Sequence, residues 1–221
     1  MSICRVFQYA YTQARVLARI GDMPDNTQWR HISEARDLDT LIARMRENKL
    51  QYWIKDLPRE PGTNSIELHL RTRLVAFFGE LEMLLPGRWS NARCWLREGA
   101  ELVSVDQPHL WMNWWDGLPG VFPRMHHREL AAISRVHTLA VQHLHRIHSA
   151  SSETAGDLDL QWQWRNELTV KLRASLAGDP FHAGLVMVYA LLQAMQFERS
   201  RALLLSLSRG WEPPDLLRGA D

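Results

Sequence analysis

The feature that most constrains the fold of this chain is a long uncharged run near its C-terminal end. From Pro180 to Phe197 no residue carries a formal charge, and Asp179 and Glu198 bracket the run. Leu, Val, Met, Ala and aromatic residues dominate it. A membrane-spanning helix needs about 20 apolar residues, which is longer than this run. The run therefore predicts a core helix that is buried on most sides.

The ends of this helix also carry recognisable signals. Asp179-Pro180 is the pattern of an N-cap followed by proline at the first helical position. Gly210 and the pair Pro213-Pro214 form the next stop signal, so the helix can extend to Arg209. A break near Gln196 is the alternative.

Apolar residues recur at helical spacing through much of the remaining chain. This spacing predicts helices over residues 3–20, 37–52, 66–85, 90–102, 126–148 and 158–176. Asp37 and Ser65 are the expected N-caps of two of these helices. No segment shows the alternation of a half-buried strand. The predicted fold class is therefore all-α.

Proline and glycine interrupt this pattern in two places. Residues 58–65 read as a linker, and residues 104–124 look irregular. The predicted organisation is a single all-helical unit over residues 1–221. Within it, residues 1–57 with 158–221 and residues 65–150 would form two lobes.

Composition limits the partners and the compartment. The formal net charge is +1, so bulk electrostatics gives no reason to expect a nucleic-acid partner. Two cysteines, Cys4 and Cys94, cannot build a disulfide framework and favour a reducing compartment. The first eight residues contain no continuous apolar segment typical of a signal peptide. We expect a cytoplasmic protein with no direct membrane span.

The helix predicted over residues 126–148 is rich in histidine. Its six histidines are His126, His127, His137, His143, His145 and His148. His145 and His148 are three residues apart and could share a metal ion. However, the histidines mostly flank an apolar stripe, and no HExxH or cysteine-containing ligand set accompanies them. The pattern favours a solvated or hydrogen-bonded helix surface, and no metal ligand is predicted.

Aromatic residues offer a second candidate site. Trp111, Trp114 and Trp115 cluster in the irregular segment, where a packing role is favoured and a partner interface is the alternative. Trp162 and Trp164 stand two apart on a predicted helix. They lie on different faces, so at least one should meet a loop, another subunit or water.

The sequence gives little support for catalysis. It has neither a Gly-x-Ser-x-Gly elbow nor a GxxxxGK phosphate loop. Glu80 and Glu82 are close in sequence but should project differently from a helix. The acidic run at residues 34–39 is explained as a helix start. We predict that the chain is not an enzyme, with no catalytic residue and no bound cofactor.

Both ends of the chain resemble the C subunit of V-type rotary ATPases, which is subunit d in the eukaryotic enzyme. The matching residues are Tyr9, Ala10, Tyr11, Ala14, Arg15, Asp37, Leu38, Leu41, Met45, Tyr52, Pro180, Gly184, Tyr189, Glu198 and Arg201. The family usually has Lys-Glu shortly before the last glutamate, where this chain has Met195 and Gln196. The match covers residues 3–57 and 160–211. Family members are longer, with three similar helical domains around a funnel, so this chain resembles a shortened, divergent member.

The resemblance implies a noncatalytic role in ion or proton transport. In the family, the subunit sits between the membrane rotor ring and the central shaft and transmits torque. The resemblance thus implies a bacterial-type adaptor that is peripheral to the inner face of the membrane and binds rotor or shaft subunits. One alternative is a paralogue that keeps the fold but binds another protein. A second alternative is a metal-dependent helical enzyme that uses the histidine-rich helix.

Overall fold

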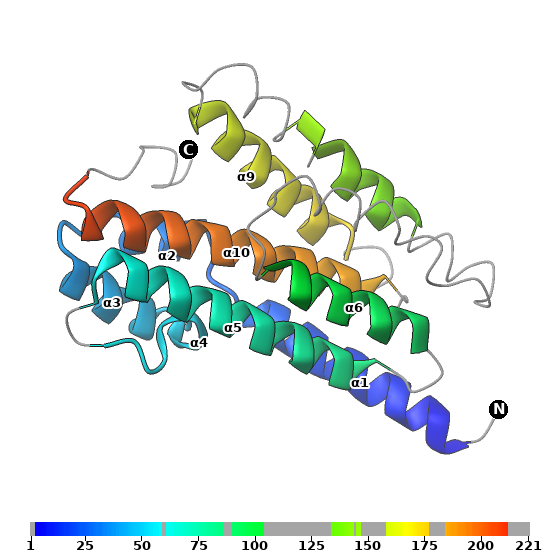
Figure 1. Ribbon diagram of the computed structural model, residues 1–221. Coiled ribbons are helices and arrows are strands. Elements are labelled where there is room, and N and C mark those ends of the chain that lie inside the picture. Colours follow the sequence, from blue (N-terminus) through cyan, green and yellow to red (C-terminus); the bar gives the residue numbers. More distant parts are fainter. Residues whose placement is uncertain are drawn as a thin grey trace.

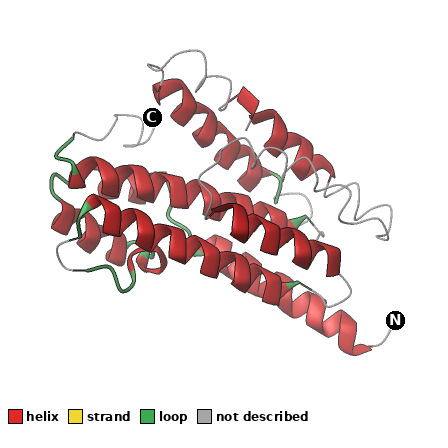
Figure 2. Ribbon diagram, in the orientation of Figure 1, coloured by secondary structure: helices red, strands yellow, loops and turns green. Residues whose placement is uncertain are grey.

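The computed structural model describes residues 3–58, 61–85, 90–103, 134–143, 145–146, 158–176 and 184–211. These residues form helices and turns, and no strand occurs among them, which confirms the all-α prediction (Figure 2). The helices are α1 (Ile3–Gly21), α2 (Asn26–Ser33), α3 (Leu38–Glu47), α4 (Gln51–Ile54), α5 (Thr63–Leu84), α6 (Ser90–Val103), α9 (Leu158–Ala174) and α10 (Leu185–Ser208). A further helical segment covers residues 134–143 and 145–146.

Helix α10 is the centre of the fold. It packs against α1, α3, α5 and α9, and Figure 1 shows it between α5 on one side and α9 on the other. Every residue from Gly184 to Leu192 is buried. The helix continues without a break through Gln196 to Ser208, and Gly210 then takes a left-handed conformation with φ of 70°. The predicted buried helix is confirmed from Leu185 onward, and Gly184 stands at its N-cap position. Asp179 and Pro180, the predicted start, lie outside the described residues.

The core around α10 is strongly aromatic. The Trp53 ring centre lies 5.4 Å from that of Phe197 and 6.1 Å from that of Phe77. Phe77 in turn meets Tyr189 edge to face, with 5.7 Å between the ring centres. Such pairs add stabilisation beyond the area they bury. This cluster joins α4, α5 and α10 through residues far apart in the sequence.

One helix was absent from the sequence-based prediction. Helix α2 follows a reciprocal capping box, in which the Asp25 side chain accepts from the Gln28 amide and the Gln28 side chain accepts from the Asp25 amide. The Asp-x-x-Gln spacing was the available signal. The eight-residue helix has few apolar positions, so the periodicity did not reveal it.

Two predicted helices differ in detail from the structure. Asp37 caps α3 as predicted, with its side chain accepting from the Thr40 amide at 2.7 Å. The segment predicted as one helix over 37–52 is interrupted at Lys49, whose φ is 63°. Ser65 is not the N-cap of α5, because the helix begins at Thr63 and the Ser65 hydroxyl donates to the Gly62 carbonyl. Gly62 occupies the cap position.

The two predicted lobes share one hydrophobic cluster in the described residues. Helix α5, from the predicted 65–150 lobe, packs along α10, from the other. An ion pair between Arg201 of α10 and Glu67 of α5, at 2.9 Å, supports the same contact. No helix of the described residues is long and apolar enough to cross a membrane.

Candidate functional site

The histidine-rich segment places one histidine where the sequence pattern did not expect it. His143 is 2% exposed, so it lies with Val136 and Ala140 on the buried face instead of flanking it. Its Nδ1 is 3.0 Å from the Leu139 carbonyl oxygen, and its Nε2 is 3.4 Å from Lys171 Nζ. The ring therefore bridges this segment to α9. Its hydrogen bonds explain its burial without a metal ion.

The other histidines do not form a metal-ligating group in the described part of the chain. His145 is exposed and His137 is half-buried. His126, His127 and His148 lie outside the described residues, so the His145/His148 pair is not described as a pair. No cluster of three or more His, Cys, Asp or Glu side chains suited to a metal occurs among the described residues.

Of the tryptophans singled out from the sequence, as of the histidines, only some lie in the described residues. Trp111, Trp114 and Trp115 lie outside the described residues, and their predicted packing or interface role stays a prediction. Trp162 is buried and Trp164 is half-buried. The two tryptophans thus lie on different faces of α9, as the spacing predicted, and Trp164 is on the more exposed face.

Glu80 and Glu82 bind different neighbours. Glu80 pairs with Arg19 of α1 at 3.2 Å, while Glu82 accepts from Arg97 of α6. The two carboxylates therefore project apart, which confirms that prediction. They hold α5 against two other helices.

The residues that carry the family resemblance mostly lie in the core or in ion pairs within the chain. Tyr189 is buried, and its hydroxyl is 3.5 Å from Arg19 Nη1. Arg201 pairs with Glu67 and, at 3.9 Å, with Glu198. On α1, Tyr11 is exposed and lies beneath the Arg15 guanidinium. Ala10 and Ala14 of α1 are also exposed, whereas the contacts of Tyr189 and Arg201 hold helices together.

The first candidate site is an exposed stripe on α5, which we call the α5 stripe. It consists of Leu68, Thr72, Val75, Ala76, Gly79 and Met83. These are all the exposed residues of α5 between positions 68 and 83, and none of them is charged. Leu68 is 68% and Met83 76% exposed, although both are large apolar residues. An extended apolar surface of this kind is typical of a protein interface.

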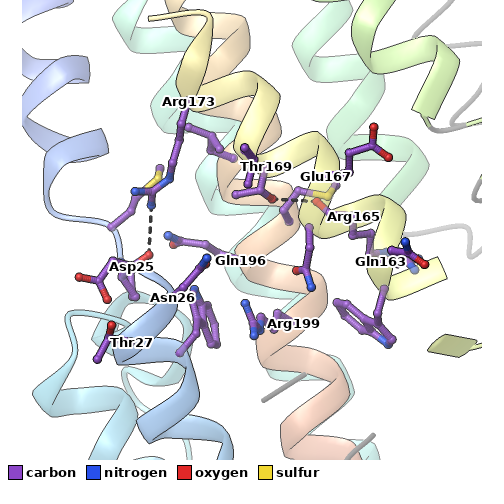
Figure 3. A pocket seen from close by; sticks show the side chains of 18 residues that line it. Asp25, Asn26, Thr27, Gln163, Arg165, Glu167, Thr169, Arg173, Gln196 and Arg199 are labelled. Atoms are coloured by element: carbon purple, nitrogen blue, oxygen red, sulfur yellow. Dashed lines mark hydrogen bonds between the residues drawn. The ribbon is translucent and has the colours of Figure 1, made fainter. Parts of the chain in front are cut away.

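The second candidate site is a cleft of about 710 Å³, which we call the arginine cleft. Three parts of the chain enclose it: the turn and first residues of α2, one face of α9, and the middle of α10 (Figure 3). The contributing positions on α10 are Leu192, Met195, Gln196 and Arg199. Their spacing of three and four residues places them on one helical face.

Two guanidinium groups of this cleft lie over tryptophan rings. Arg199 is 7% exposed, and its Cζ lies 4.7 Å from the centre of the Trp29 ring. Arg165 Cζ lies 4.9 Å from the centre of the Trp162 ring. Burial lowers the pKa of Arg199 to about 10 and also lowers the pKa of Arg165. At neutral pH Arg199 keeps its positive charge, and both guanidinium groups are partly desolvated.

The remaining charged residues of the cleft have defined structural partners. Arg173 reaches from α9 and donates to the Pro24 carbonyl at 3.0 Å, as the dashed line in Figure 3 shows. Asp25 caps α2, and Glu167 accepts from Lys171. The Lys171 contact is the main cause that lowers the pKa of Glu167. Both acidic groups are thus engaged at the edges of α2 and α9.

Sequence reasoning missed the arginine cleft. The matching positions on α9 are Trp162, Arg165, Asn166, Thr169, Val170 and Arg173, a mostly polar stripe whose two arginines are eight residues apart. That stripe, and the polar residues Gln196 and Arg199 in the middle of α10, were the available signals. Nothing in the sequence placed them opposite Trp29, because α2 is far from α9 and α10 along the chain.

Comparison with known proteins adds no relative to this picture: no protein-family model, no curated protein and no solved structure matches the chain.

Proposed function

We propose that this protein is a noncatalytic adaptor that binds other proteins through the α5 stripe, and that its partners are rotor or shaft subunits of a V-type rotary ATPase. The partner identity rests on the resemblance of the two terminal segments to the C subunit of that enzyme. The stripe is the observation that carries the protein-binding role.

The arrangement of α1 and α10 supports the resemblance. The two segments that carry most of it lie almost at opposite ends of the sequence, yet α1 and α10 pack directly against each other. Arg19 and Tyr189 join them through a side-chain contact. The described α1 residues of the resemblance, Ala10, Tyr11, Ala14 and Arg15, are exposed, so this contact supports the pairing of the two terminal helices and is made by other residues of α1.

The α5 stripe has the chemistry of an interface core. It runs from Leu68 to Met83, which corresponds to about 22 Å along a helix. Large apolar residues stand at its ends and the small residues Ala76 and Gly79 between them. A second helix can approach closely over small residues, and the core of an interface is depleted in charge. The charged residues Glu67, Arg71 and Glu82 border the stripe.

The test is co-purification of tagged protein from native membranes and cytosol. We compare wild type with a Leu68→Glu/Met83→Glu double variant, which places two charges on the stripe. A buried charge without a partner is costly in an interface, so rotary ATPase subunits should be recovered with wild type and lost with the double variant.

The matched control is Trp211→Glu, which adds a charge at a 60% exposed apolar residue beyond α10. It should recover the same subunits as wild type. If wild type recovers no rotary ATPase subunit, the partner assignment is wrong. Reproducible recovery of an unrelated protein that depends on the stripe would instead favour the paralogue alternative.

A further inference from the structure

The α5 stripe is arranged symmetrically along its helix. Its positions lie in pairs, at equal distances on either side of the midpoint between residues 75 and 76. The pairs are Leu68 with Met83, Thr72 with Gly79, and Val75 with Ala76. We propose that a second copy of this chain binds here, with the two α5 helices packed antiparallel about that midpoint. The inference rests on the proposed function, which makes the stripe a protein-binding surface, and it names one occupant of that surface.

Antiparallel packing about a twofold axis brings matching parts of the stripe together. Leu68 of one copy then lies at the level of Met83 of the other, and Thr72 lies at the level of Gly79. Large apolar side chains thus meet at both ends of the contact, while small ones in between allow the helices to approach closely. The stripe runs almost parallel to the helix axis, as in helix pairs that cross at about 20°. Contact can therefore extend along its whole length.

The charged residues beside the stripe select the antiparallel direction. At about 100° per residue, Arg71 and Glu82 lie along one edge of the stripe, and Arg73 and Glu80 lie along the other. Two antiparallel copies bring the same edges together, so Arg71 lies near Glu82 of the second copy, and Arg73 near its Glu80. Two parallel copies would bring opposite edges together and place Glu80 near Glu82. Like charges oppose that direction, whereas opposite charges favour the antiparallel one.

These four charged groups also have partners within their own chain. The contact between copies brings a second opposite charge to each group, so it does not require a free side chain. Exposed ion pairs contribute little affinity, and their main effect here is on direction. The partners within the chain are Glu67 for Arg71, the Tyr52 carbonyl for Arg73, Arg19 for Glu80 and Arg97 for Glu82.

The stripe lies opposite the face that α5 buries in the core. That face includes Ile66, Leu70, Leu74, Phe77 and Leu81. Two copies can therefore join without any rearrangement of the described core. The dimer covers the surface that the proposed function gives to another protein, so self-association and the binding of that protein exclude each other.

Sedimentation equilibrium of the purified, untagged chain tests the self-association. A contact along about 22 Å of one helix is small for a permanent dimer, so we expect a dissociation constant on the order of 10–100 μM. The Leu68→Glu/Met83→Glu double variant places like charges opposite each other and should remain monomeric at concentrations where wild type is a dimer. Trp211→Glu is the matched control and should dimerise as wild type does.

Disulfide formation between single-cysteine variants tests the direction. Cys4→Ser/Cys94→Ser removes both natural thiols, and Leu68→Cys and Met83→Cys are made separately in that background. A disulfide needs Cα atoms within about 7 Å. The antiparallel pair meets this condition between the two variants, whereas the two copies of position 68 lie about 22 Å apart. Under mild oxidation the mixture should therefore form a heterodimer that neither variant forms alone. Circular dichroism checks that each variant is folded.

Three results would overturn the inference. They are a monomer at every concentration up to about 1 mM, a dimer that persists in the double variant, and self-linking of Leu68→Cys as fast as in the mixture. A monomer that still recovers rotary ATPase subunits would refute the dimer and leave the proposed function intact. An antiparallel dimer that recovers none of those subunits would support this inference and refute the partner assignment.

Discussion

Helices α5 and α10 pack along each other, and neither separates its apolar residues onto one face. Their surroundings nevertheless differ. Helix α10 is enclosed by α1, α3, α5 and α9, and none of its residues, all of which the structure describes, is exposed. Helix α5 has neighbours on only part of its surface and leaves Leu68, Val75 and Met83 exposed. Other helices of the chain thus enclose α10, whereas α5 keeps an exposed apolar surface that is suited to a partner.

The largest expected effect concerns the enclosed helix. Leu185 of α10 is 0% exposed, so Leu185→Ala should lower the free energy of unfolding by about 2–5 kcal/mol. The cost comes from lost burial and from the cavity that remains. Urea denaturation monitored by circular dichroism measures it. A loss below about 0.5 kcal/mol, as for ordinary surface changes, would contradict the central position of α10.

The second prediction uses the pH dependence of stability. Burial raises the pKa of Tyr189 above the ordinary tyrosine value of about 10. The folded state therefore holds this proton at pH values where the unfolded state loses it. Its contribution to stability is complete below pH about 10 and is lost as the pH rises toward the folded-state pKa.

Denaturation at alkaline pH tests this prediction. Tyr189→Phe should make the fall in unfolding free energy shallower above pH about 10, with Tyr11→Phe on an exposed position as the control. Burial also raises the pKa of Tyr52, so some slope should remain in the Tyr189 variant. An unchanged slope in Tyr189→Phe would mean that this hydroxyl is accessible to water.

The third prediction concerns α5 and is an increase in the free energy of unfolding instead of a decrease. A Cβ added at Gly79 of α5 meets no atom within 4 Å. Gly79→Ala should therefore raise the free energy of unfolding by about 0.5–1 kcal/mol, because alanine loses less backbone entropy in a helix. Urea denaturation gives the value. Destabilisation would show that this position is closely packed.

The smallest effect completes the comparison. Leu68→Ala on the α5 stripe removes the same atoms as Leu185→Ala but from a side chain that is 68% exposed. It should change the free energy of unfolding by less than about 0.5 kcal/mol. The pair is measured under identical conditions. Similar losses at both leucines would remove the contrast between the two helices.

Local chemistry made much of the fold predictable. The Asp37 cap, the stop at Gly210 and the burial of the uncharged run follow from residues close together in sequence. Apolar periodicity does not reveal α2, whose capping box is the local signal for it. The burial of His143 was not predictable in this way, because it depends on the Lys171 and Glu167 side chains of another helix.

By itself, the sequence determined that this chain is helical and that its most apolar segment is buried. Helix formation depends on hydrogen bonds and side chains within a few residues, so the local pattern is enough. Only the tertiary structure decided that α5 keeps an exposed apolar stripe and that Arg199 lies over Trp29. Which surface remains open, and which charges meet, depends on contacts between segments that are distant in sequence, and helical periodicity carries no information about those contacts.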